Sequence, residues 1–456
     1  MAEEGKGRLL IAAGSSGAGK TTVTCGLLTA FQRRGLSLAA CKCGPDYIDP
    51  MFHRQVLGVP SRNLDLFLCG EEAVMALLAE SCECAELTLI EGVMGFYDGL
   101  NWTDEASSHH LSRVTNIPVL LVADCRGRSV TLAAELRGIV DFAPNNIAGI
   151  LLNRCAQGSY PKLKELVEKH TGLPVVGYLP TVKEVELESR HLGLVTAGEV
   201  ENLRGKLDLL ADQLERTVEL DRLLEIACSA PPIARKMVER EKTAQGIRIG
   251  VAEDEAFCFT YQDNLLLLER MGAEIVPFSP LGDAGLPKNL HGLILSGGYP
   301  ELHAERLSAN RGMLAALKKA VESGMPTIAE CGGFMALCES LATEENGGSF
   351  PMAGAVRSTV KMTKRLSHFG YVTMTAEKDN LLAAKGETIR AHEFHYSEAS
   401  DPGSAFTASK ADGREWPCVH GGGSLYAGYP HIHFWGNKTA AERFVEGCRE
   451  RKRKTM

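Results

Sequence analysis

Short apolar runs without polar alternation recur along the N-terminal half of the chain. They lie at Leu9–Ala13, Leu87–Glu91, Pro118–Ala123 and Ile147–Leu152, and segments with helical periodicity separate them. A strand that is buried on both faces is apolar at nearly every position, and parallel strands need a crossover between them, usually a helix. The pattern therefore predicts a parallel sheet that is covered by helices on both faces.

A second series of apolar runs follows in the C-terminal half. Its members are Ile247–Ala252, Glu274–Phe278, Gly292–Ser296, Pro326–Ala329 and the aromatic run Leu425–Phe434. The segment between the two series is charged and helical, and Pro231 and Pro232 interrupt it. We predict an α/β protein with two doubly wound sheet domains, over residues 1–199 and 246–449, joined by a helical connection and linker over 200–245.

Composition narrows the class of protein. The chain has 456 residues, of which 45% are hydrophobic and 23% charged, as in ordinary globular proteins. Its net charge of −8 disfavours a nucleic-acid partner. We expect no signal peptide, no membrane span and a cytoplasmic location. The 14 cysteines are scattered without metal-ligand spacing, so packed free thiols in a reducing compartment are expected.

A glycine-rich loop follows the first apolar run. Residues 14–21 match the P-loop pattern, between a predicted strand and a predicted helix. The backbone N–H groups of such a loop cradle phosphates, and the helix N-terminus favours the anion. Lys20 would reach the β- and γ-phosphates, and the Thr21 hydroxyl would bind Mg²⁺. The residues expected to bind ATP are Gly14, Ser15, Ser16, Gly17, Ala18, Gly19, Lys20, Thr21 and Thr22.

Carboxylates follow two stretches of the N-terminal half. Glu91 ends an apolar strand, and Asp46 and Asp49 lie on a loop that a Gly-Pro pair opens. Ligands of doubly wound sheets bind at the carboxyl ends of strands, and Mg²⁺ prefers hard oxygen ligands. Each aspartate is equally well explained as a turn or cap residue, whereas a glutamate at the end of a buried strand is harder to explain structurally. Asn153 also ends a strand and is a candidate for contact with the nucleotide base.

Cys331 carries the strongest signal of the C-terminal half. It follows an apolar run and precedes two glycines, which indicates a sharp turn from a strand into a helix. Such a turn exposes a nucleophile, and the helix N-terminus favours the thiolate. The N–H of Gly332 would stabilise an oxyanion, together with Gly298 from another glycine-rich strand end. An inert buried thiol is the alternative interpretation. The candidate bases are His392, His395, His431 and His433.

Six motifs occur in the order of a known family. They are Gly14–Thr21, Gly44–Pro50, Glu91–Gly99, Gly297–Leu302, Ala329–Phe334 and His392–Ser397. Over nearly the whole chain they resemble the cobyrinate a,c-diamide synthases. The resemblance implies a dethiobiotin-synthetase-like domain followed by a class I glutamine amidotransferase domain. It also implies ATP- and Mg²⁺-dependent amidation of the a and c acetate groups of cobyrinic acid, on the cobalamin route, with glutamine as the nitrogen donor.

The resemblance assigns roles to particular residues. Cys331 matches the nucleophile and His431 the base, while His433 stands where typical class I domains carry a glutamate. What orients His431 is therefore left open. The resemblance also implies Thr21, Glu91 and Asp46 as magnesium ligands. It places Tyr47 and Asp98 around the substrate carboxylate.

Other interpretations share these motifs. A nickel-sirohydrochlorin a,c-diamide synthase of the F430 route and a hydrogenobyrinic acid a,c-diamide synthase would use the same chemistry on a different tetrapyrrole polycarboxylate. A P-loop nucleotide-switch scaffold is the non-enzyme alternative. Ser15 argues against it, because the partition ATPases carry a lysine at that position. The expected partners are ATP, L-glutamine and the macrocycle, without nucleic acid or membrane, and a homodimer is allowed for.

Overall fold

The computed structural model describes residues 6–182, 197–233, 242–343 and 348–455. The chain forms two compact units. The first comprises Met1–Leu66 and Gly70–Met237, and the second comprises Phe67–Cys69 and Val238–Met456. Within the described ranges, no helix is long and apolar enough to cross a membrane.

The first unit is built on a seven-stranded parallel sheet with the order β3-β2-β4-β1-β5-β6-β7. Its strands are β1 (Gly7–Ala13), β2 (Leu38–Cys43), β3 (Ser61–Leu64), β4 (Leu87–Glu91), β5 (Val119–Asp124), β6 (Ile147–Asn153) and β7 (Val175–Leu179). The four runs predicted from their apolar pattern are strands of this sheet. The order reverses around β1, so the strand that leads into the P-loop lies in the middle of the sheet.

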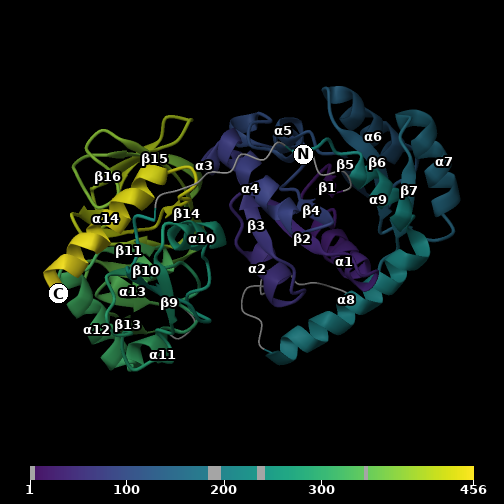
Figure 1. Ribbon diagram of the computed structural model, residues 1–456. Coiled ribbons are helices and arrows are strands. Elements are labelled where there is room, and N and C mark those ends of the chain that lie inside the picture. Colours follow the sequence, from purple (N-terminus) through teal and green to yellow (C-terminus); the bar gives the residue numbers. More distant parts are fainter. Residues whose placement is uncertain (1–5, 183–196, 234–241, 344–347, 456) are drawn as a thin grey trace. The chain divides into compact units, whose positions relative to one another are not determined.

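Helices cover both faces of this sheet (Figure 1). They are α1 (Lys20–Arg33), α2 (Ile48–Gln55), α4 (Glu71–Glu83), α5 (Ser108–Thr115), α6 (Val130–Phe142), α7 (Tyr160–Thr171), α8 (Ala197–Thr217) and α9 (Leu220–Cys228), with a 3-10 turn at Leu100–Trp102. One core joins alternate residues of β1, such as Leu9 and Ile11, to α1, α2, α8 and α9. Apolar strands between two helical layers are the arrangement that the pattern predicted.

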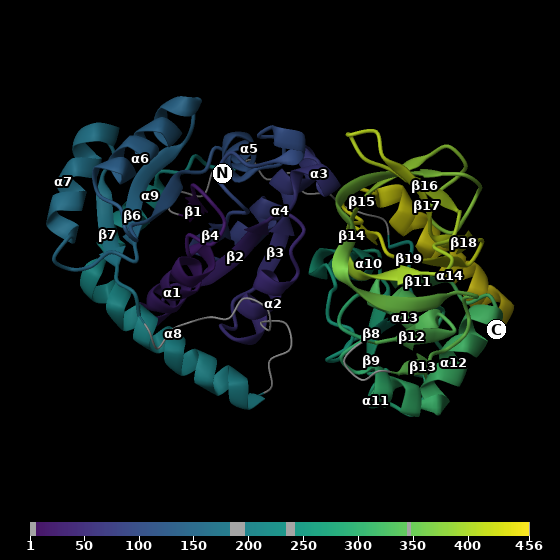
Figure 2. The same ribbon diagram turned by 180° about the vertical axis from the view of Figure 1, so that it is seen from behind.

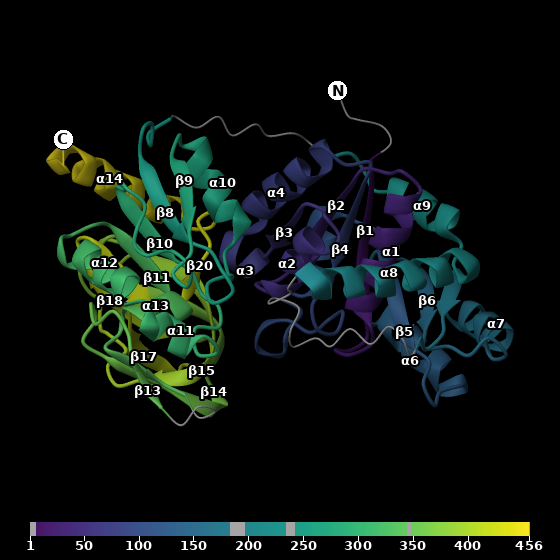
Figure 3. The same ribbon diagram turned by 90° about the horizontal axis from the view of Figure 1, so that it is seen from below.

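The helices α8 and α9 come from the predicted connection over 200–245, and they pack in the core of the first unit. Helix α8 lies along α1 (Figure 3). A Cβ atom on Gly26 of α1 would lie 2.6 Å from Leu214 and 2.8 Å from Leu210, so glycine allows this close approach. Residues 234–241 of the connection lie outside the described part of the chain.

The second unit contains a six-stranded sheet with the order β18-β19-β11-β10-β8-β9 (Figure 2). All its neighbours are parallel except β18 and β19. The strands are β8 (Arg248–Ala252), β9 (Glu274–Phe278), β10 (Gly292–Leu295), β11 (Thr327–Glu330), β18 (His420–Gly422) and β19 (Leu425–Gly428). The accompanying helices are α10 (Gln262–Arg270), α11 (Ala304–Ala309), α12 (Arg311–Glu322), α13 (Gly332–Leu337) and α14 (Lys438–Thr455). The prediction of an α/β fold is confirmed in both units.

A second, mostly antiparallel sheet of this unit was not predicted. It contains β12 (Ser340–Ala342), β13 (Ser349–Pro351), β14 (Thr359–Ala376), β15 (Thr388–Ala399), β16 (Phe406–Ser409), β17 (Glu415–Cys418) and β20 (His431–Ile432). The predicted run Leu425–Phe434 is divided between the two sheets, as β19 and β20. Pro430 explains the break, because proline cannot donate a ladder hydrogen bond. The break carries His431 to the edge of the second sheet, where it pairs with His392 of β15.

The short helix α3 (Leu66–Cys69) contributes its last three residues to the second unit. The ring of Phe67 contacts that of Tyr371 with centroids 4.6 Å apart, and its carbonyl accepts a hydrogen bond from Arg390 at 3.0 Å. A segment from the N-terminal half of the sequence is thus packed among strands of the C-terminal unit.

Candidate active sites

The P-loop connects β1 to α1 in the first unit, as predicted. Gly19 has a φ of 95°, a left-handed conformation that glycine adopts without strain, and Lys20 begins the helix. The Lys20 amine donates to the carbonyl of Ser15 at 3.3 Å and to that of Met94. Burial and the neighbouring Lys42 lower the pKa of Lys20 to about 8, against the opposing carboxylates. An anionic ligand in contact with this amine would stabilise its charged form and raise its pKa.

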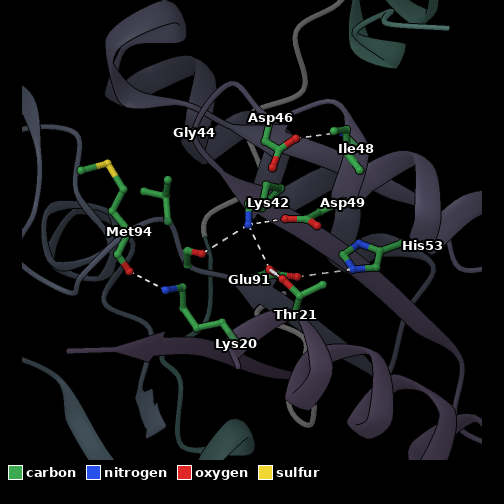
Figure 4. Close-up of polar contacts among 12 residues, drawn as sticks. Lys20, Thr21, Lys42, Gly44, Asp46, Ile48, Asp49, His53, Glu91 and Met94 are labelled. Atoms are coloured by element: carbon green, nitrogen blue, oxygen red, sulfur yellow. Dashed lines mark hydrogen bonds and ion pairs between the residues drawn. The ribbon is translucent and has the colours of Figure 1, made fainter. Parts of the chain in front are cut away.

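A polar cluster lies beside the P-loop at the carboxyl ends of β2 and β4 (Figure 4). The Thr21 hydroxyl donates to Glu91 Oε1 at 2.6 Å, and Lys42 Nζ lies 3.0 Å from the same oxygen. Lys42 also pairs with Asp49, and His53 Nε2 lies 3.7 Å from Glu91 Oε2. These five side chains come from four elements and point toward one another.

The charges of this cluster stabilise each other. Burial alone would raise the pKa of Glu91, but Lys42, the nearby His53 and the hydrogen bond from Thr21 hold it well below its usual range. Burial likewise opposes the charge of Lys42, yet Glu91 and Asp49 raise its pKa well above the ordinary value. Because buried charges are tolerated only when they are paired, Lys42 holds Glu91 ionised at neutral pH. Burial and the charge of Glu91 raise the pKa of Asp49 well above its ordinary value, so the two carboxylates differ.

Lys42 is a residue that the sequence reasoning missed. Its partner across the adjacent parallel strands is Glu91, so the two side chains leave the sheet at the same edge. The available signal was its position near the end of a strand, shortly before Asp46 and Asp49. The predicted loop carries only Asp46, because Asp49 lies in the first turn of α2. A lone lysine in a charged chain gave no reason to select it.

The remaining predicted residues of this half occupy nearby loops. Asp46 Oδ1 accepts the N–H of Ile48 at 2.8 Å at the start of α2, and Tyr47 precedes that helix half-buried. Asp98 Oδ2 accepts the N–H of Gly95 at 3.0 Å. Asn153 Nδ2 donates to the P-loop carbonyl of Ala18 at 2.7 Å, which places this side chain against the loop backbone. Asp49 rather than Asp46 is thus the aspartate that joins the ion-paired cluster.

The Thr21–Glu91 pair fits a magnesium ion. A hydroxyl and a carboxylate are both hard oxygen donors, and Glu91 Oε2 is buried without a hydrogen bond among the described residues. The described chain contains no group of three or more His, Cys, Asp or Glu side chains placed to hold a metal. Mg²⁺ usually takes only one or two carboxylates and completes its shell with phosphates and water, so this donor set is sufficient when ATP is bound.

Cys331 lies on a strained turn between β11 and α13 of the second unit. Its φ of 46° and ψ of −103° are unusual for a residue with a side chain. The neighbouring glycines permit a tight fit. A Cβ atom on Gly332 would lie 3.1 Å from the Gly298 nitrogen, and one on Gly333 would lie 2.1 Å from the Leu295 carbonyl oxygen. The backbones of Gly332 and Gly298, the two predicted oxyanion donors, therefore lie side by side.

His431 is the candidate base that the fold brings to Cys331. Burial by itself would lower the pKa of His431, but hydrogen bonds with Cys331 and Glu330 raise it to about 10. His431 Nδ1 lies 3.3 Å from Glu330 Oε2, and Glu330 Oε1 accepts the N–H of Ile432 at 3.0 Å. The raised pKa favours the imidazolium form of His431, which can donate a proton beside the Cys331 nucleophile.

The other candidate histidines have different surroundings. His433 is fully buried, its Nδ1 accepts the N–H of Trp435 at 3.3 Å, and its ring packs on that of Tyr261. His395 stacks on Tyr429 with centroids 3.7 Å apart. Burial and the nearby His431 lower the pKa of His392 to about 3, so it stays neutral.

Comparisons with known proteins agree with this division of the chain. Residues 9–195 match the CobQ/CobB/MinD/ParA nucleotide binding domain, and residues 248–439 match the CobB/CobQ-like glutamine amidotransferase domain. Among solved structures, the MinD cell division protein of Aquifex aeolicus covers 50% of this chain and all of its own at 13% identity, with a TM-score of 0.31. A likeness of that size carries no argument about function.

Curated relatives match over nearly the full length. A cobyrinate a,c-diamide synthase of Caldanaerobacter subterraneus is 39% identical over 96% of this chain and 98% of its own. Proteins of the same name from Listeria innocua and Priestia megaterium are 41% and 35% identical, over 94% and 98% of this chain and 97% and 98% of their own.

The P-loop unit and the Cys–His unit, with these matches, define an ATP-dependent amide ligase that uses glutamine. Within that class, the chain belongs to the cobyrinate a,c-diamide synthase family.

Proposed function

We propose that this protein amidates the a and c acetate carboxylates of cobyrinic acid in cobalamin biosynthesis. The observation that carries the proposal is that one chain contains both sites. One is a P-loop with the Thr21–Glu91 pair, and the other is a strained Cys331 that is hydrogen-bonded to His431. The near-complete coverage of relatives named cobyrinate a,c-diamide synthase supports the choice of acceptor.

The P-loop unit would activate the acceptor. A carboxylate is a poor electrophile, because its oxygen would have to leave as hydroxide or oxide. A carboxylate oxygen therefore attacks the γ-phosphorus of ATP, the bond to ADP breaks, and an acyl phosphate forms. Lys20 offsets charge on the phosphates during this transfer. Thr21 and Glu91 would hold Mg²⁺, which supplies further charge neutralisation when bound.

The second unit would supply ammonia from glutamine. The Cys331 thiolate attacks the amide carbon, and the N–H groups of Gly332 and Gly298 receive the developing oxyanion. His431 then donates a proton to the nitrogen as the C–N bond breaks, which releases ammonia and leaves a glutamyl thioester. Water hydrolyses the thioester and restores the thiolate. Ammonia attacks the acyl phosphate carbon and phosphate leaves.

Several finer assignments belong to the proposal. Asp46 is kept as a magnesium ligand through water, since Mg²⁺ retains several waters in such sites. Tyr47 and Asp98 would contact the substrate carboxylate, and Asn153 the nucleotide base. We also propose a cytoplasmic location, which fits free thiols at all 14 cysteines, every one of them a described residue.

The test is mass spectrometry of the products with three acceptors. Purified protein, ATP, Mg²⁺ and glutamine are incubated separately with cobyrinic acid, hydrogenobyrinic acid and nickel-sirohydrochlorin. The proposal expects two successive amidations of cobyrinic acid, faster than any amidation of the other two. Faster amidation of the nickel compound would move the protein to the F430 route with the same chemistry. ATP hydrolysis without amidation of any acceptor would instead favour a nucleotide switch.

A further inference from the structure

Glu330 is the residue directly before the nucleophile, and it makes two hydrogen bonds around the candidate base. It ends β11 and is largely buried. Its Oε2 lies 3.3 Å from His431 Nδ1, and its Oε1 accepts the backbone N–H of Ile432 at 3.0 Å. One carboxylate thus holds both the ring of the histidine and the strand that carries it.

The turn at Cys331 makes this geometry available. Successive side chains of a regular strand point to opposite faces of the sheet, which would keep residues 330 and 331 apart. The left-handed φ of Cys331 ends the strand at Glu330. Both side chains then reach the same imidazole, which comes from β20 of the other sheet.

Hydrogen-bond chemistry assigns the two ring nitrogens. A carboxylate can only accept, so Nδ1 of His431 carries the proton that it shares with Glu330. Nε2 is then the nitrogen that bonds Cys331. His433, two residues further along, directs its Nδ1 to the N–H of Trp435 instead.

We propose that Glu330 is the positioning residue of the glutaminase centre and completes a Cys331–His431–Glu330 relay. This inference rests on the proposed glutaminase half of the function. Glu330 fixes the ring orientation and the tautomer of His431, and its charge stabilises the imidazolium that later protonates the leaving ammonia. It does not touch the reacting atoms. The acid of the relay thus comes from the nucleophile's own strand, rather than from the position two residues after the histidine.

The decisive variant is Glu330→Gln. Its carbonyl oxygen can still accept the N–H of Ile432, while its NH₂ group faces Nδ1 and favours the tautomer that cannot accept a proton from Cys331. We expect the glutaminase kcat to fall by about 10²-fold or more. Amidation with ammonium chloride as the nitrogen source is expected to stay at the wild-type rate, since that reaction bypasses Cys331.

A pH profile separates positioning from a merely structural role. The titratable groups that face His431 include Cys331, Glu330 and His392. Loss of the Glu330 charge is expected to move the alkaline limb of glutaminase kcat to lower pH by about one unit or more. Glu393→Gln is the matched control: Glu393 is also a buried glutamate, but its carboxylate lies 3.6 Å from His395. The alkaline limb of the Glu393→Gln profile should stay at the wild-type pH.

The outcomes are distinguishable. A Glu330→Gln protein that is folded, with wild-type glutaminase kcat and pH profile, overturns the relay. A wild-type protein without glutaminase activity overturns the proposed function and the relay with it. If Glu330→Gln does not fold, Glu330→Asp decides, since it keeps the charge but withdraws it by one methylene. The relay then predicts a kcat that is lower by about tenfold, with an unchanged KM for glutamine. An unchanged kcat would overturn the relay.

Discussion

In the nucleotide half, the pKa of one buried residue, Lys20 of the P-loop, bears directly on ATP binding. Lys20 is 8% exposed and makes its hydrogen bonds to backbone carbonyls, with Lys42 nearby. Burial and the charge of Lys42 lower the pKa of Lys20 to about 8, and contact with an anionic phosphate would raise it again. ATP binding and protonation of Lys20 are therefore linked.

This linkage predicts how ATP affinity depends on pH. The pKa of Lys20 is lowered in the free protein, and phosphate contact raises it. Below pH 8 the affinity should be flat, and above it the Kd should rise by up to about tenfold per pH unit. Calorimetry with a non-hydrolysable ATP analogue, in buffers of different ionisation enthalpy, should show proton uptake near pH 8.5. The control is Lys20→Arg, which stays charged and should show no uptake.

At the scale of elements, glycines set how closely the strands and helices around Cys331 approach. Gly333 is the second residue of α13 and lies against β10, and a Cβ atom there would lie 2.1 Å from the Leu295 carbonyl oxygen. This oxygen belongs to the backbone at the end of a central strand, so it cannot shift to relieve the contact. The strained turn at Cys331 is therefore fixed by contact between two elements and not by its own residues alone.

We predict that Gly333→Ala destabilises the second unit. Overpacking of this kind costs about 1–3 kcal/mol, and a backbone neighbour points to the upper end. The urea midpoint should fall by up to about 1 M, because the m-value of a unit of this size is roughly 3 kcal/mol per M. Tryptophan fluorescence reports it, because Trp435 is buried in this unit whereas Trp102 is fully exposed. Gly422→Ala on β18 is the control, since its Cβ meets nothing within 4 Å; a similar loss in both variants would contradict the argument.

Elements that bury apolar runs could be predicted from the sequence, and elements held by polar contacts could not. β3 contains Ser61 and Asn63, and its burial depends on hydrogen bonds such as those from Asn63 to the carbonyls of Gly44 and Asp46 at 2.8 and 2.7 Å. Such contacts join residues far apart in sequence and leave no local periodicity. The motif residues Thr21, Glu91, Cys331 and His431 were found because their chemistry is local, whereas Lys42 and Glu330 gain meaning only from their tertiary partners.

For the whole molecule, the two chemistries occupy separate compact units of one chain. Every side chain of the ion-paired P-loop cluster belongs to the first unit, and Cys331, His431 and Glu330 belong to the second. The membership of Phe67–Cys69 in the second unit could not be predicted from the sequence, because it depends on a packing contact with Tyr371 more than 300 positions away.

Separate units predict separable losses. Cys331→Ala should abolish product with glutamine as donor by at least about 10³-fold, while product with ammonium chloride stays near the wild-type rate. Lys20→Ala should lose product with either donor, because no acyl phosphate forms, yet it should still hydrolyse glutamine. Product is measured by mass spectrometry and glutamate by a coupled assay. Loss of ammonia-dependent product in Cys331→Ala would contradict this division, since it would tie the thiol to acceptor activation rather than to ammonia release.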